Sequence, residues 1–87
     1  MQTPIINARD LGRALRAERR ALAVTQQGIA EATQTRRQTI VDLEAGRNVS
    51  IHTLFTALSA LGKGLAIVDT RVDLDQLQSA LSERDED

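Results

Sequence analysis

Arg36, Arg37 and Gln38 stand in a row and carry the side chains of this sequence best suited to reading base pairs. A guanidinium fork matches the O6 and N7 atoms of guanine, and a glutamine amide matches the N6 and N7 atoms of adenine. Two adjacent arginines at the start of a helix also oppose the helix dipole, which favours a functional role over an ordinary surface one. We therefore predict that these three residues contact DNA bases.

Four further polar residues flank this row and are predicted to contact the DNA backbone. They are Gln26, Gln27, Thr39 and Arg47. The two glutamines open the preceding helix, where amide groups and main-chain N–H donors can hold phosphate. Asp42 lies one turn beyond the row, where its carboxylate could accept a hydrogen bond from cytosine N4 or repel phosphate, and both interpretations stay open.

Helices must position these side chains, because the apolar residues before and after them recur at helical spacing. The pattern predicts helices over about 8–22, 26–32, 36–45 and 51–61. Asn7, Thr25 and Ser50 have the short polar side chains that cap helix N-termini. Gly46 is the residue expected to end the third helix in the left-handed region.

The pattern changes after residue 64, where a short β-compatible run begins. The run consists of Leu65, Ala66, Ile67 and Val68. A lone strand has no partner within an otherwise helical chain, so it predicts antiparallel pairing with a second copy across a two-fold axis. Leu74, Leu77 and Leu81 then suggest a weak fifth helix. The expected fold is all-α, with about five short helices and one C-terminal strand that pairs across a homodimer.

Charge divides the 87 residues into a basic body and an acidic tail. Residues 1–64 hold nine Arg and Lys against five Asp and Glu, and residues 65–87 hold two against seven. A basic body is typical of a protein that meets a polyanion, although an acidic end can also be a simple solvated terminus. We expect a DNA-binding and dimerisation domain over 1–69 and an acidic tail over 70–87.

The four arginines of the first helix recur on one face, opposite its apolar residues. They are Arg9, Arg13, Arg16 and Arg20. Two interpretations stay open: a solvated face, or an outer contact with the DNA backbone or a partner.

Enzymatic chemistry is excluded because catalysis needs convergent titratable groups. The chain has one His, no Cys and no Tyr, so we predict neither an enzyme nor a metal or cofactor site. Its longest apolar runs of about four residues are far below the roughly 18 needed to span a bilayer. Residues 1–6 are neither basic nor long enough for a secretory signal, so a soluble, cytoplasmic protein is expected.

The segment TQQGIAEATQTRRQTIVDLEAG, residues 25–46, resembles the helix-turn-helix of the Xre or phage-repressor family. The resemblance extends over about residues 10–64. It implies a lambda-repressor-like fold and a dimeric, sequence-specific repressor that binds operator DNA. It also implies a buried ion pair between Glu44 and Arg19. Ala23 and Gln34 stand where the family commonly has glycine.

A narrower resemblance is carried by LFTALSALGKGLAIVD, residues 54–69, which is similar to HipB-type antitoxins. It implies a dimer closed by the C-terminal strand, repression of the protein's own operon, and a HipA-type kinase toxin as a second partner. Two alternatives stay open. One is a stand-alone phage-type repressor, and the other is a protein-interaction adaptor that keeps the fold without binding DNA.

Overall fold

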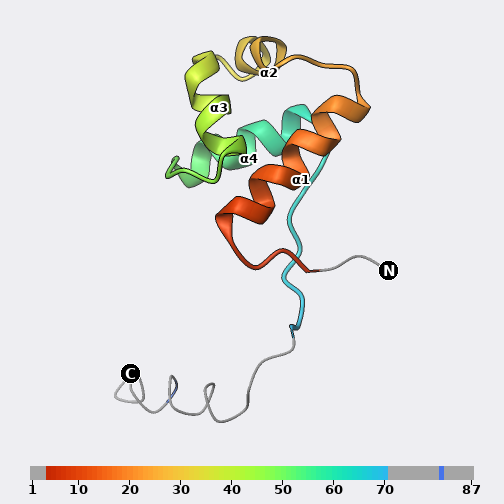
Figure 1. The fold of residues 1–87 in the computed structure, drawn as a ribbon, viewed down its shortest axis with the longest axis vertical. Helices are drawn as coiled ribbons and strands as arrows, with labels where there is room; N and C mark the ends of the chain where they lie inside the picture. Colours follow the sequence, from red (N-terminus) through yellow and green to blue (C-terminus); the bar gives the residue numbers. More distant parts are fainter. Residues whose placement is uncertain (1–3, 71–80, 82–87) are drawn as a thin grey trace.

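The computed structural model describes residues 4–70 and residue 81, and four helices form its body (Figure 1). They are α1 (Ala8–Ala21), α2 (Gln26–Ala32), α3 (Arg37–Glu44) and α4 (Ile51–Ala60). Helices α2 and α3 pack against each other, with α1 against α3 and α4 against α2. The predicted all-α class is confirmed, and each of these helices agrees with its predicted range to within one residue at either end.

Side chains cap three of the four helices, because the first N–H groups of a helix have no partner within it. Asn7, Thr25 and Ser50 each accept a hydrogen bond from the main-chain N–H three residues further on, at 2.7, 2.9 and 3.0 Å. Arg36 caps α3 in extended conformation without a side-chain hydrogen bond. It therefore precedes α3, whereas the sequence pattern placed it inside the helix.

All four helices end in the same way, at a residue in the left-handed region. These residues are Ala23, Gln34, Gly46 and Gly62, with φ of 58°, 56°, 79° and 70°. The next N–H then donates to the carbonyl five residues back, as between Arg47 and Asp42 at 2.8 Å. Gly46 has the conformation predicted for it, while Ala23 and Gln34 hold one that favours glycine.

A single apolar cluster joins the helices. Its buried members are Leu15, Ile29, Ala30, Ile40, Leu43, Ala57, Leu58 and Leu61. Gly12 lets α1 approach the end of α3 closely. A Cβ added at this position would lie 2.7 Å from the Leu43 carbonyl oxygen and still closer to that of Glu44. The main chains therefore meet directly here, at a position where only a residue without a side chain fits.

After α4 the chain leaves the helical body and runs in extended form past the N-terminal segment (Figure 1). Residues 65–68 belong to no strand within the part of the chain that the structure describes. The predicted strand therefore does not form inside the described part of one chain, and its pairing with a second copy stays a prediction. The predicted fifth helix falls outside the described residues, apart from Leu81. None of the described helices is long and apolar enough to cross a membrane.

Candidate nucleic-acid interface

The three residues predicted to read bases lie together at the start of α3. Arg36 precedes the helix, Arg37 and Gln38 form its first turn, and all three are exposed. The helix N-terminus also presents unpaired N–H groups and the positive end of the dipole on this side. This end of α3 therefore offers forked donors and a favourable field to a polyanion.

Arg37 makes one long hydrogen bond to α2. Its Nη2 donates to Gln26 Oε1 at 3.4 Å, while Gln26 Nε2 donates to Glu44 Oε1 at 3.1 Å. Both polar atoms of the Gln26 amide therefore make contacts within the protein. Since an amide nitrogen carries two protons, one donor of Gln26 is left for the backbone phosphate that the sequence analysis assigned to it.

Asp42 accepts hydrogen bonds from two of the other residues predicted to contact DNA. Its Oδ1 accepts from Gln38 Nε2 at 2.9 Å and from Arg47 Nη1 at 3.0 Å. The hydrogen bond from Gln38, followed by that from Arg47, holds the pKa of Asp42 below its ordinary value. The carboxylate therefore stays charged, and Gln38 and Arg47 would exchange it for a base or a phosphate on binding DNA.

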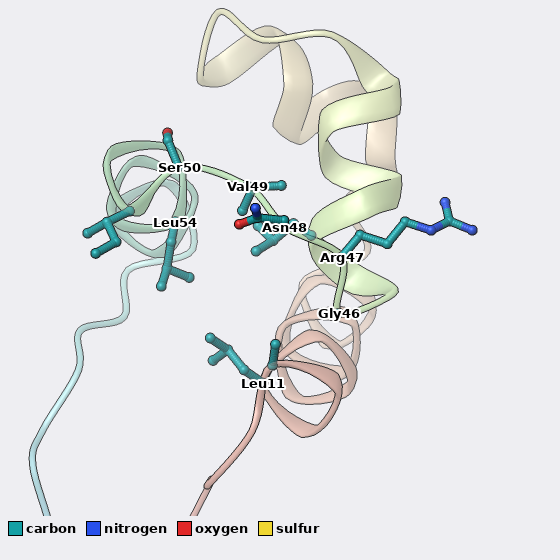
Figure 2. Close-up of a pocket in the computed structure, with 10 residues that line it drawn as sticks. Leu11, Gly46, Arg47, Asn48, Val49, Ser50 and Leu54 are labelled. Carbon is teal, nitrogen blue, oxygen red and sulfur yellow. The ribbon is translucent and has the colours of Figure 1, made fainter.

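The two remaining backbone candidates lie nearby. Gln27 is exposed and donates to Glu31 Oε2 at 3.2 Å, and Thr39 is half-buried within α3. Arg47 belongs to the loop between α3 and α4, beside an apolar pocket of about 340 Å³. Leu11 and Leu54 point toward that pocket, whereas the Arg47 side chain points away from it (Figure 2).

Arg19 and Glu44 form a buried ion pair that underlies this surface. Arg19 Nε donates to Glu44 Oε2 at 2.6 Å and its Nη2 to Oε1 at 3.1 Å, with side-chain exposures of 10% and 6%. The third guanidinium nitrogen, Nη1, donates to the Val24 carbonyl at 2.8 Å. The hydrogen bonding of Arg19 to the Glu44 carboxylate raises the pKa of Arg19. The Glu44 carboxylate on α3 therefore contacts both α1, through Arg19, and the first residue of α2, Gln26. Arg19 in turn contacts the α1–α2 turn at Val24.

An open groove of about 650 Å³ lies beside these contacts. It is lined by Arg16, Arg19, Arg20, Thr25, Gln26, Gln27 and Arg37. The sequence pattern does not indicate that the α1 arginines lie beside Gln27 and Arg37. The one available signal was the helical spacing that puts the four arginines of α1 on one face. That spacing does not indicate which of the four lie beside α2.

A second groove is apolar and has a volume of about 680 Å³. The residues predicted to pair across a dimer, Leu65, Ala66, Ile67 and Val68, form part of its lining. Ile5 and Ile6 form part of the other wall. Ile67 is 104% exposed, so its whole side chain faces solvent in the single chain.

Comparison with known proteins agrees with this geometry. Residues 15–68 match the helix-turn-helix family. ClgR from C. glutamicum, a clp gene regulator, is 32% identical with a TM-score of 0.63, over 75% of this chain and 85% of that one.

Two HipB structures share the fold. HipB in complex with an O4 20mer is 22% identical with a TM-score of 0.74, covering 80% of this chain and 100% of that one. HipB in a HipA-HipB-O2-O3 complex is 24% identical, with the same TM-score and the same coverage. A search of curated proteins found no match.

Proposed function

This chain belongs to the helix-turn-helix family of DNA-binding transcriptional regulators, and from that premise we propose that it is a dimeric, sequence-specific repressor. Helix α3 would enter the major groove and α2 would lie across the backbone, as in other proteins with this motif. The observation that carries the proposal is the exposed row Arg36–Gln38 at the start of α3, with Arg37 held by Gln26 and Gln38 held by Asp42.

We assign base reading to the row and backbone binding to its surroundings. Arg36, Arg37 and Gln38 would contact base edges, and Gln26, Gln27, Thr39 and Arg47 would contact phosphates. The division follows from position, since side chains at the N-terminus of a recognition helix reach furthest into the groove.

The dimer would form through residues 65–68 of two copies, paired antiparallel. Two features support this: the unpaired extended main chain, and the apolar groove that these residues share with Ile5 and Ile6. A homodimer would place two α3 helices about 34–36 Å apart and so require a pseudo-palindromic site. Ile67→Pro would remove one donor from the ladder and weaken the dimer. A monomer–dimer equilibrium unchanged by Ile67→Pro in sedimentation would contradict this interface.

Within this function we favour an antitoxin of the HipB type, which represses its own operon and binds a HipA-type kinase. The support is the fold shared with the whole HipB chain in those two structures, together with the segment that follows α4. A stand-alone regulator is the second candidate, favoured by the higher identity to the clp gene regulator ClgR. Either role requires the compartment that holds the chromosome, in keeping with the expected cytoplasmic location.

A mobility shift on the protein's own upstream DNA tests the DNA-binding function. The wild-type chain should shift this DNA, and Arg36→Ala/Arg37→Ala should abolish the shift while the dimer stays intact. Each arginine that reads a base should contribute about 1–3 kcal/mol to specific binding. An equal loss on random duplex would contradict base reading, and no shift on any upstream DNA at low salt would favour the adaptor.

The toxin partner needs a separate measurement. A kinase-like reading frame beside this gene, whose product co-purifies with the chain, would support the antitoxin role. If such a product is present and does not bind the purified dimer, the stand-alone regulator is favoured.

A further inference from the structure

The open groove between α1 and α2 contains positive charge that the proposed base-reading surface does not use. Arg19 and Arg37 have partners there, in Glu44 and Gln26. Arg16 and Arg20 are exposed, and neither side chain has an ion-pair or hydrogen-bond partner among residues 4–70 and 81. The groove therefore presents two uncommitted guanidinium groups.

No carboxylate among the described residues lines this groove. Two acids contact residues that line it: buried Glu44 accepts hydrogen bonds from Arg19 and Gln26, and exposed Glu31 accepts one from Gln27 at 3.2 Å. Four arginines line the groove against these two carboxylates, so the net charge there is positive. The field of such a charge attracts polyanions and falls off within about one Debye length, roughly 8 Å at physiological salt.

The groove is continuous with the recognition surface, because Arg37 belongs to both. It lines the groove and also forms the first turn of α3. A duplex whose bases met Arg37 would carry its phosphate backbone toward Gln27 and the C-terminal half of α1.

We propose that Arg16 and Arg20 bind backbone phosphates of the duplex, so that α1 extends the DNA contact beyond the helix-turn-helix. The inference rests on the proposed DNA-binding function and adds residues that the sequence analysis left between a solvated face and an outer contact. The other two arginines of the same face, Arg9 and Arg13, do not line the groove. The two pairs are centred about 10 Å apart along the helix, given a rise of about 1.5 Å per residue.

This spacing supplies a matched control. Arg16→Ala/Arg20→Ala and Arg9→Ala/Arg13→Ala remove the same charge from the same face of α1. Binding of each variant to a labelled duplex of the protein's own upstream DNA is measured by fluorescence anisotropy, over about 50 to 200 mM NaCl. The readout is the slope of log affinity against log salt.

Each lost phosphate contact lowers this slope by about 0.9. A dimer of Arg16→Ala/Arg20→Ala loses four contacts, so its slope should shrink by about 3 to 4, equally on operator and scrambled duplex. Arg9→Ala/Arg13→Ala should keep the wild-type slope. Arg16→Lys/Arg20→Lys, which keeps the charge, should restore most of the slope and so separates a lost contact from a misfolded variant.

Three results would overturn the inference. Equal slope changes in the two pairs would indicate a general field effect. An unchanged slope in Arg16→Ala/Arg20→Ala would mean that no phosphate is bound there, and tighter DNA binding by this variant would mean that the two arginines oppose the duplex rather than bind it. If the wild-type chain binds no duplex, the proposed function fails together with the inference.

Discussion

Asp42 and Glu44 lie two residues apart on α3, and each accepts hydrogen bonds from one arginine and one glutamine. Residues at this spacing point to different sides of a helix. Glu44 and its Arg19 have side-chain exposures of 6% and 10%, whereas Asp42 and its Arg47 have 31% and 65%.

The difference in burial separates two roles for the same chemistry. A buried pair is strongly coupled, because removing one partner leaves a charge that water cannot solvate. An exposed pair contributes little to stability and can exchange partners readily. The inner cluster, Arg19, Gln26 and Glu44, therefore joins three helices. In the outer cluster, Asp42 accepts hydrogen bonds from Gln38 and Arg47, and in the proposed complex groups of the DNA would take its place as their acceptor.

The largest expected effect is the difference in the free energy of unfolding between a variant that breaks the inner cluster and one that breaks the outer cluster. Glu44→Ala leaves Arg19 unpaired and should lower the free energy of unfolding by about 3–5 kcal/mol. Asp42→Ala should lower it far less, because the Asp42 pair is exposed to solvent. Urea denaturation at neutral pH measures both values, and a similar loss for the two variants would show that burial does not distinguish them.

Gly12→Ala tests whether the inner cluster depends on the close approach of α1 to α3. The new Cβ would overlap the carbonyl oxygens of Leu43 and Glu44, so α1 must shift away and carry Arg19 with it. Overpacking of this kind should cost about 1–3 kcal/mol. Ala14→Gly offers a comparison on the same helix, with a cost near 1 kcal/mol from helix propensity. A Gly12→Ala chain as stable as the wild type would contradict the packing described here.

Asp42→Asn should sharpen the role of the outer cluster in binding. The substitution keeps an acceptor for Gln38 and Arg47 but removes a negative charge from the surface proposed to contact phosphate. Binding to non-specific duplex should tighten a few-fold at low salt, with folding nearly unchanged. Weaker binding to the operator alone would instead indicate that the carboxylate accepts a hydrogen bond from cytosine N4.

The smallest effect is expected in the pH dependence of stability. The pKa of Asp42 is lowered in the folded chain by Gln38 and Arg47, so its contribution is present above the unfolded pKa of about 3.9. That contribution is lost as the pH falls through the lowered value. The stability difference between wild type and Asp42→Asn should therefore shrink between neutral pH and about pH 3. A difference that grows on acidification would have the wrong sign.

Much of the fold followed from local pattern. Helix ranges come from apolar spacing, and the caps at Asn7, Thr25 and Ser50 depend on groups within three residues of each other. Gly12 was missed, although a glycine inside a helix costs about 1 kcal/mol relative to alanine and so signals close packing.

The sequence by itself determined the four helices, their caps and the row of side chains that opens α3, because these depend on neighbours along the chain. Only the tertiary structure decided which carboxylate is buried, that Gln26 joins Arg37 to Glu44, and that Arg16 and Arg20 rather than Arg9 and Arg13 border α2. Those outcomes depend on how the helices cross, and the crossing is set by the packing of the whole core around Gly12 and Ile40.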